Sequence, residues 1–225
     1  NGLRIGIARD RAFGFYYPSD LEAIRQSGAE LIDIDTLHQQ TLPAIDGLFI
    51  GGGFPERHAA ALSANKSLRE SIRNAIEGGL PAYAECGGLM YLAKSIHWNG
   101  ESHDMVGVLP AQAIMHERPQ GRGYVVLDEN PDAHPWPSRP ATAAPLQAHE
   151  FHYSALQGLP ADARFAHRVL RGKGIQQQQD GYIHGNLLAS YAHLRNTSAT
   201  PWVRRFLQFV QAHKMNNTET IANAL

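Results

Sequence analysis

The chain's single cysteine, Cys86, lies in the segment Ala84–Gly88, between a predicted strand and a predicted helix. Small residues two positions before and two positions after the thiol are typical of a nucleophile elbow, a sharp strand-to-helix turn that exposes a reactive side chain. The N-terminal end of a helix favours the thiolate, because the peptide dipoles place partial positive charge there. The pattern predicts a nucleophile, although a buried structural cysteine at an ordinary turn remains the alternative.

A glycine-rich turn, Gly51–Gly53, follows the buried apolar run Gly47–Ile50. Glycine allows backbone N–H groups to approach a ligand closely. Beside a nucleophile, the N–H groups of this turn and of Gly87 would form an oxyanion hole. A flexible turn without a ligand is the alternative. A phosphate loop is not predicted, because neither G-x-G-x-x-G nor G-x-x-x-x-G-K-[ST] occurs in the chain.

Among the 12 histidines, His193 is the best candidate for a general base. It follows the strand-like run Leu187–Ala192, and α/β sheets place their sites at the carboxyl ends of strands. A second group lies on the short segment 149–152, where strand alternation places His149 and Phe151 on one side and Glu150 and His152 on the other. A metal site built from His149, His152 and His184 is disfavoured, because nothing in the sequence fixes ligand spacing, and we predict no metal.

Strand and helix patterns alternate over the first part of the chain. Strands are expected at 3–8, 29–34, 47–50 and 81–84, and helices at 19–28 after a Ser19–Glu22 capping box, at 65–78 with Asn65 as cap, and from Gly87 to Leu92. This alternation predicts an α/β domain with a doubly wound, mostly parallel sheet. The second half is less regular. It offers strands at 105–108, 123–127, 148–153 and 187–191, loops at 131–145 and 176–179, a helix at 199–213 and a frayed tail from Asn216.

Composition excludes several classes of protein. The 225 residues carry a formal charge of −1, which argues against a nucleic-acid binder that works by neutralising phosphates. One cysteine cannot form an internal disulfide or a cysteine-rich zinc site. No apolar run is long enough to span a bilayer and no signal peptide is visible, so we expect a reducing cytoplasm. We predict one domain over residues 1–213, followed by a polar tail over 214–225.

The order of these segments resembles the class I, triad-type glutamine amidotransferases, and most closely the glutaminase domain of the cobyrinic acid a,c-diamide synthase family. The resemblance runs over roughly positions 3 to 210. The stretches A-E-C-G-G-L-M-Y-L at 84–92 and H-E-F-H-Y-S at 149–154 are its most specific parts, and further matching stretches lie at 9–18, 46–56, 105–110 and 189–194. The resemblance implies the flavodoxin-like class I glutaminase fold.

The resemblance also implies roles for individual residues. Cys86 would be the nucleophile, His193 its base, and Gly52 or Gly53 together with Gly87 the oxyanion donors. Glutamine binding or contact with a synthetase half would involve Glu56, His149, Glu150, Phe151, His152 and Tyr153. The implied reaction hydrolyses glutamine through a cysteine thioester and delivers ammonia to the side-chain carboxylates of a cobyrinate-type tetrapyrrole. No cofactor is expected in this chain, and ATP and Mg²⁺ would belong to an N-terminal synthetase half that this chain lacks.

Two departures from the family pattern leave alternatives open. Triad members usually carry a glutamate two residues after the histidine, where this chain has Arg195, so the third member of the triad is not identified. No P-loop occurs either, so the chain is expected to be a glutaminase half alone. The alternatives are another cysteine hydrolase of the same superfamily, and a binding module that has lost catalysis together with the triad acid.

Overall fold

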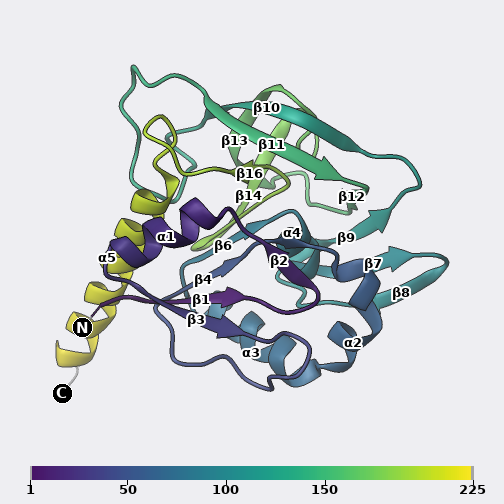
Figure 1. The fold of residues 1–225 in the computed structure, drawn as a ribbon, viewed down its shortest axis with the longest axis horizontal. Coiled ribbons are helices and arrows are strands. Elements are labelled where there is room, and N and C mark those ends of the chain that lie inside the picture. Colours follow the sequence, from purple (N-terminus) through teal and green to yellow (C-terminus); the bar gives the residue numbers. More distant parts are fainter. Residues whose placement is uncertain (1, 224–225) are drawn as a thin grey trace.

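The computed structural model describes residues 2–223, with side chains described as far as residue 216. The core of the protein is a ten-stranded sheet with the order β16-β11-β10-β13-β14-β15-β6-β4-β1-β3 (Figure 1). One half is parallel and consists of β3 (Glu30–Ile34), β1 (Arg4–Ala8), β4 (Gly47–Ile50), β6 (Ala82–Glu85) and β15 (Leu187–Ser190). Every residue of β4, β6 and β15 is buried, as expected for parallel strands that are covered on both faces.

The other half of this sheet is antiparallel. It consists of β14 (Gln179–His184), β13 (Arg164–Arg171), β10 (Gly121–Glu129), β11 (Leu146–His152) and the short β16 (His193–Leu194). A four-stranded sheet, β12-β9-β7-β8, comprises β12 (Ser154–Gln157), β9 (Leu109–Met115), β7 (Ala93–Trp98) and β8 (Glu101–Asp104). A two-stranded sheet pairs β2 (Phe13–Phe15) with β5 (Gly52–Gly53).

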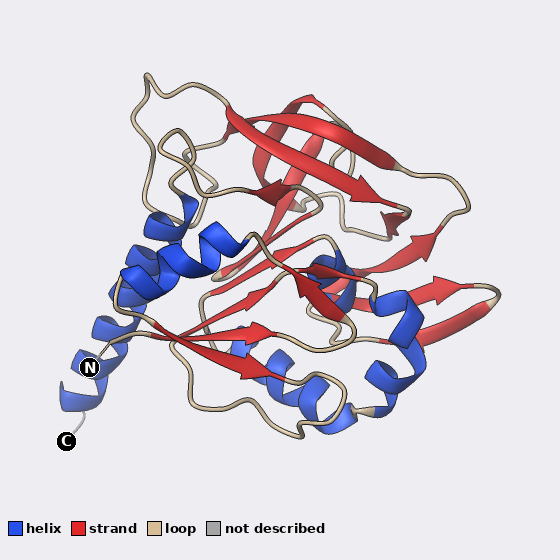
Figure 2. Ribbon diagram, in the orientation of Figure 1, coloured by secondary structure: helices blue, strands red, loops and turns tan. Residues whose placement is uncertain are grey.

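Helices cover both faces of the parallel strands (Figure 2). Helices α1 (Pro18–Gln26) and α5 (Trp202–Asn223) lie side by side on one face, and the 3₁₀ helix η1 (Pro55–His58), α2 (Ala59–Ala64) and α3 (Lys66–Glu77) lie on the other. Strand alternation divides the core accordingly. Phe49 and Tyr83 pack with Phe206 of α5, whereas Ile50 packs with Ile72 of α3. The short helix α4 (Gly87–Leu92) follows β6 directly.

Of the two predicted helix N-caps, one is confirmed and one is wrong. The Asn65 cap is confirmed, because its side chain accepts a hydrogen bond from the Leu68 N–H at 3.4 Å. The predicted Ser19–Glu22 capping box is wrong. Helix α1 begins at Pro18 after Tyr17, which makes no side-chain cap. The Asp20 carboxylate is buried instead, and it accepts hydrogen bonds from the Trp202 indole at 2.8 Å and the Asn196 N–H at 3.0 Å.

Two segments of the second half also differ from expectation. The predicted strand at 105–108 is wrong, because the residues form an irregular connection between β8 and β9 in which Gly107 has a φ of +79°. The helix predicted at 199–213 begins only at Trp202, after Pro201, and continues to Asn223. The tail that was expected to be frayed from Asn216 is therefore helical as far as Asn223. Within residues 2–223, no helix is long and apolar enough to cross a membrane.

Candidate active site

The turn between β6 and α4 holds Cys86 in a conformation that non-glycine residues rarely adopt. Its backbone has φ +48° and ψ −100°, and its side chain is mostly buried. The Cys86 N–H donates to the Ser190 carbonyl at 2.8 Å, and its own carbonyl accepts from Met90 at 3.1 Å. A Cβ on Gly88 would lie 2.2 Å from the Ile50 carbonyl oxygen. The elbow therefore needs its small residue at 88, and strained backbone of this kind is concentrated at functional sites.

The glycine turn after β4 lies against this elbow. The Gly88 N–H donates to the Gly51 carbonyl at 3.1 Å, and the Gly51 N–H donates to the Tyr16 hydroxyl at 3.1 Å. A Cβ on Gly87 would stand 2.8 Å from the Gly53 nitrogen. The structure thus brings the predicted oxyanion residues Gly53 and Gly87 into backbone contact, while the N–H groups of Gly51 and Gly88 already have partners.

His193 comes to the same place from β16, in the antiparallel half of the sheet. Its ring lines the same cavity as the Cys86 thiol, and its Nδ1 lies 3.4 Å from Oε2 of Glu85. Burial alone would lower the pKa of His193. The neighbouring Cys86 and Glu85 side chains outweigh that effect and raise the pKa to about 10. The protonated imidazole is therefore the stable form beside the thiol at neutral pH.

Cys86 and His193 open into a cavity of about 200 Å³. This volume suits a small polar substrate better than a drug-sized ligand, which needs about 300–1,000 Å³. The lining comprises Phe15, Tyr16, Tyr17, Gly53, Phe54, Cys86, His149, Phe151 and His193. The Phe151 carbonyl accepts from the Cys86 thiol at 3.6 Å. His149 and Phe151 thus line the cavity, as their position on one face of a strand predicted.

The opposite face of β11 points into the protein. The Glu150 carboxylate accepts backbone hydrogen bonds from Lys173 at 2.6 Å and Gly174 at 3.0 Å. Burial alone would raise the pKa of Glu150, but the His152 ring, 3.5 Å away, and the hydrogen bonds from these two N–H groups lower it. The His152 ring stacks on Tyr191 with 3.7 Å between ring centroids. The structure therefore separates Glu150 and His152 from the cavity, as strand alternation predicted, although the family resemblance grouped them with His149.

Two other predicted residues lie outside the cavity lining. Glu56 is in η1, and burial raises the pKa of its carboxyl. Tyr153 follows β11 and packs edge-on against Phe151 at 5.6 Å between centroids. Sequence reasoning missed Glu85, and it did not assign Phe15, Tyr17 or Phe54 to the site. The signal for Glu85 was present, because residues 83 and 85 share one face of a predicted strand beside the nucleophile.

One buried group resembles a metal site. Within the described residues, ligand atoms of Glu129, His134 and His167 all lie within 4.8 Å of one another. Arg205 donates to both Glu129 oxygens, at 2.8 and 2.7 Å, and so supplies the counter-charge without a metal. Burial lowers the pKa of His134 and brings the pKa of His167 down to about 3, so both rings are neutral. This cluster joins β10, β13 and the 131–145 loop to α5.

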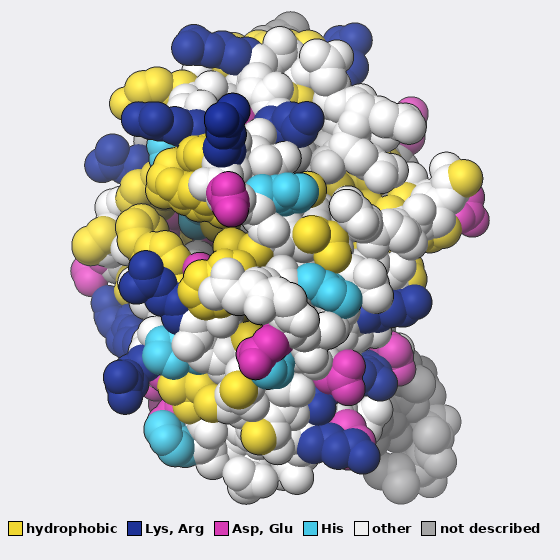
Figure 3. Space-filling view, turned by 90° about the vertical axis from the view of Figure 1, so that its right-hand side faces the viewer, with side chains coloured by type: hydrophobic (Ala, Val, Ile, Leu, Met, Phe, Trp, Pro, Cys, Tyr) yellow, Lys and Arg dark blue, Asp and Glu magenta, His cyan; other side chains and the backbone are white. Residues whose placement is uncertain are grey.

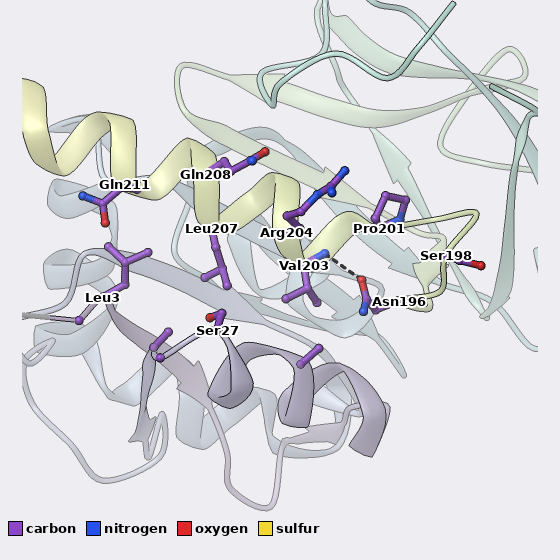
Figure 4. A pocket seen from close by; sticks show the side chains of 14 residues that line it. Leu3, Ser27, Asn196, Ser198, Pro201, Val203, Arg204, Leu207, Gln208 and Gln211 are labelled. Carbon is purple, nitrogen blue, oxygen red and sulfur yellow. Dashed lines mark hydrogen bonds between the residues drawn. The ribbon is translucent and has the colours of Figure 1, made fainter. Parts of the chain in front are cut away.

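A second cavity, of about 580 Å³, lies between α1, α5 and the start of β1 (Figure 4). Its lining includes Leu3, Ser27, Val203 and Leu207, with Arg204 at its edge, and the Asn196 side chain accepts from the Val203 N–H at 3.3 Å. None of the predicted site residues belongs to this lining. It offers no thiol, imidazole or carboxylate among the described residues, so the Cys86 cavity is the better candidate for the active site.

Exposed aromatic side chains lie on or beside the mouth of the Cys86 cavity. Phe15, Phe54 and Tyr124 are 65%, 51% and 75% exposed, and Phe151 is 43% exposed. Figure 3 shows the side of the molecule toward which β1 and β4 point in Figure 1. Hydrophobic side chains gather on this side, and lysine and arginine side chains lie above and below them. Clustered exposed apolar side chains of this kind commonly mark an interaction surface.

Comparison with solved structures identifies the fold. PurLQS from Thermotoga maritima is similar with a TM-score of 0.69, at 14% identity, over 95% of this chain and 99% of that one. A putative GMP synthase subunit from Thermoplasma acidophilum is similar with a TM-score of 0.65, at 16% identity, over 97% and 98%. The predicted α/β class and class I glutaminase fold are confirmed, and the structure adds that the parallel strands continue into an antiparallel half.

Sequence comparison gives the family. Residues 4–200 match the family described as CobB/CobQ-like glutamine amidotransferase domain. The chain is 44% identical over 207 residues to a cobyrinate a,c-diamide synthase of Magnetococcus marinus, covering 92% of this chain and 44% of that protein. It is 40% identical over 206 residues to the synthase of the same name from Methanothermobacter thermautotrophicus, covering 91% and 44%. The chain spans less than half the length of these relatives. The resemblance predicted from the motifs is confirmed, and the chain belongs to the CobB/CobQ-like glutamine amidotransferase domain family.

Proposed function

We propose that this chain is the glutaminase part of an amidotransferase and that Cys86 attacks the side-chain amide of glutamine. The observation that carries the proposal is the strained Cys86 elbow, which shares the lining of a small cavity with His193. In that pair, His193 holds a proton that can pass to the departing amide nitrogen.

The proposed reaction has two halves that balance. A bond forms between the Cys86 Sγ and the amide carbon, the C–N bond breaks, and the His193 proton leaves with ammonia. Water then adds to the thioester carbon, its proton passes to His193, and the C–S bond breaks to release glutamate and the thiolate. The backbone N–H groups of Gly87 and of Gly52 or Gly53 would stabilise the oxyanion, a contribution of about 10²–10³ in rate for one donor.

The ammonia is proposed to serve a synthetase part that binds ATP and Mg²⁺ and amidates carboxylates of a cobyrinate-type tetrapyrrole. The relatives' printed name and their extra length support this assignment. The exposed aromatic residues Phe15, Phe54 and Phe151 of the cavity lining, with Tyr124 beside His149, support contact with that part on this face. Within this proposal, His149 and Phe151 contact glutamine, while Glu56, Glu150, His152 and Tyr153 support the cavity wall from outside.

The test compares two amido donors in the full-length protein, with cobyrinate as acceptor. The Cys86→Ser variant should lose glutamine-dependent amidation and glutamate release by at least about 10³-fold, while amidation with added ammonium salt continues. Diazo-oxo-norleucine should label the wild type at Cys86, which is the only cysteine of this chain. Equal glutamate release by the wild type and Cys86→Ser would refute the proposal.

The two alternatives give different results in the same assays. A cysteine hydrolase of another kind would turn over peptide or glyoxal substrates and would not respond to glutamine. A binding module without catalysis would show no labelling of Cys86 by diazo-oxo-norleucine at any pH. If the protein amidated another tetrapyrrole in place of cobyrinate, the proposed glutaminase activity would stand and only the proposed acceptor would be wrong.

A further inference from the structure

Glu85, the residue immediately before the nucleophile, is buried between two segments that hold His193. Its side chain is 3% exposed. Oε1 accepts hydrogen bonds from the Tyr83 hydroxyl at 2.6 Å and from the Leu194 N–H at 2.9 Å. These two donors leave Oε2 to face Nδ1 of His193 at 3.4 Å. One carboxylate therefore contacts both the ring of His193 and the backbone of the residue that follows it.

The residue at the family's usual acid position has a different environment. Arg195 lies two residues after His193, and its guanidinium carbon is 5.6 Å from the centre of the Tyr17 ring. A cation at this position cannot accept the Nδ1 proton of an imidazole. Any group that orients the base must therefore come from another part of the fold, and Glu85 is the carboxylate that the structure places on Nδ1.

We propose that Glu85 is the positioning residue for His193 and takes the place of the triad acid that Arg195 replaces. This inference rests on the proposed function. Glu85 accepts the proton on Nδ1, which fixes the tautomer and turns Nε2 toward the thiol. A Cβ on Gly52 would stand 2.7 Å from Cε1 and 3.5 Å from Nε2 of His193, so the ring is also confined from the glycine turn. The nucleophile and the group that orients its base are thus adjacent in the chain.

The other titratable groups near His193 do not provide this contact. His149 is the strand partner of His193 on β11. Tyr16 and Tyr17 come from the segment before α1, and burial raises the pKa of both hydroxyls, so they stay neutral over the range of an assay. Asp180 acts on the backbone, because its carboxylate accepts from the N–H groups of Tyr191 and Ala192 at 3.0 and 2.9 Å. Glu85 is therefore the carboxylate that, together with Cys86, raises the pKa of the His193 ring.

The first test measures kcat, KM and the pH profile for glutamine hydrolysis in the full-length protein. Glu85→Gln keeps the shape of the side chain but removes its charge. We expect kcat to fall by about 10²–10⁴, the range between a lost supporting contact and a lost triad acid, with little change in KM. The limb of the profile at high pH should move to lower pH, because the imidazolium loses its counter-charge. Glu85→Asp should restore part of kcat and part of the position of the high-pH limb.

Asp20→Asn provides the matched control. Asp20 is a buried carboxylate, 2% exposed, with hydrogen bonds to Trp202 and Asn196. The same acid-to-amide change at this position should leave the high-pH limb where it is in the wild type. A folded Glu85→Gln protein with wild-type kcat and an unchanged limb would overturn the proposal.

A second readout does not depend on glutamine turnover. The rate of Cys86 alkylation by iodoacetamide reports the thiolate, and a thiolate paired with an imidazolium reacts at a lower pH than a free thiol, which titrates near ~8.5. Glu85→Gln should shift this reaction to higher pH. A shift without any glutaminase activity would refute the proposed function and keep the positioning role. Glutaminase activity in the wild type, together with an unshifted alkylation profile in Glu85→Gln, would keep the proposed function and refute the positioning role.

The third readout needs no Glu85 variant and so covers the case in which Glu85→Gln fails to fold. In the wild-type protein labelled with ¹⁵N-histidine, the His193 signals are assigned by their loss in His193→Gln. We expect Nδ1 to carry its proton across the active range of pH. A neutral ring protonated only at Nε2 would overturn the proposal.

Discussion

The Tyr83 hydroxyl donates a hydrogen bond of 2.6 Å to Oε1 of Glu85, and both side chains lie on the same face of β6. The Tyr83 ring stacks on Phe49 with 5.3 Å between centroids, so it is fixed by packing independently of the hydroxyl. Burial and the Glu85 charge raise the pKa of Tyr83 far above its ordinary value, which keeps the hydroxyl as a donor. Tyr83 thus connects the aromatic core of the protein to the proposed site.

Removal of this donor should have a small and specific effect. Tyr83→Phe keeps the ring contacts and leaves Glu85 with the Leu194 N–H on Oε1. We expect the free energy of unfolding to fall by about 1 kcal/mol, the usual contribution of one buried hydrogen bond. Urea denaturation measures it, and the glutaminase rate should fall less than in Glu85→Gln. A larger loss of kcat in Tyr83→Phe than in Glu85→Gln would contradict this order.

The glycine turn and the elbow should respond differently to an added methyl group. In Gly52→Ala the Cβ would stand 2.7 Å from Cε1 of His193, a side-chain atom that can move. Displacement of the ring should lower kcat by about 100-fold with little loss of stability. Steady-state kinetics and thermal unfolding of the same preparation separate the two effects, and an active Gly52→Ala enzyme would argue against the observed packing.

Gly88→Ala is the matched comparison. Here the Cβ would meet the Ile50 carbonyl oxygen at 2.2 Å, which is backbone and cannot move aside. The result should be a lower stability, by about 1–3 kcal/mol or more. Calorimetry or urea unfolding measures it. A Gly88→Ala protein as stable as the wild type would show that the elbow tolerates a larger residue.

The pH dependence of glutamine hydrolysis should reflect His193. Burial lowers its pKa, but Cys86 and Glu85 together raise it to about 10, so the ring is protonated throughout the neutral range. Activity should therefore persist at mildly alkaline pH and fall as the pH rises through about 10, where the donor to the leaving ammonia is lost. A kcat/KM profile between pH 6 and 10.5 checks this, and a loss of activity centred near 7 would contradict it.

Stability should depend on pH through Asp180, which fixes the backbone just before His193. Burial raises its pKa to about 6, against the lowering effect of hydrogen bonds from Ala192, Tyr191 and Gly181. The folded state therefore binds more protons than the unfolded state between about pH 4 and 6, so this group makes stability fall as pH rises through that range.

The effect of Asp180 can be isolated by comparison with Asp180→Asn, which does not titrate at position 180. The stability of the wild type relative to the variant should decline by about 2–3 kcal/mol from pH 4 to 6 and stay level above that. Urea unfolding of both proteins at several pH values measures the difference. A constant difference over the whole range would contradict the raised pKa.

The sequence by itself determined the elbow around Cys86, the glycine turn at 51–53 and the parallel strands, because these features depend on local turn geometry and on apolar runs that are contiguous in the chain. It also predicted His193 as the base from its place after a strand, and the structure brings this residue into the Cys86 cavity. The strands β7, β8, β13 and β14 were not predicted, because their alternation is mixed with charged and polar residues at half-buried positions.

Only the tertiary structure decided what surrounds the base. Glu85 and Leu194 are 109 residues apart in the chain, and they meet because β15 pairs with β6 while β16 pairs with β11. No local pattern encodes that pairing. The same is true of β11, where alternation predicted two faces and the sheet packing decided that His149 and Phe151 line the cavity while Glu150 and His152 are buried. Strand order places the reactive groups together, and strand order depends on contacts between distant residues.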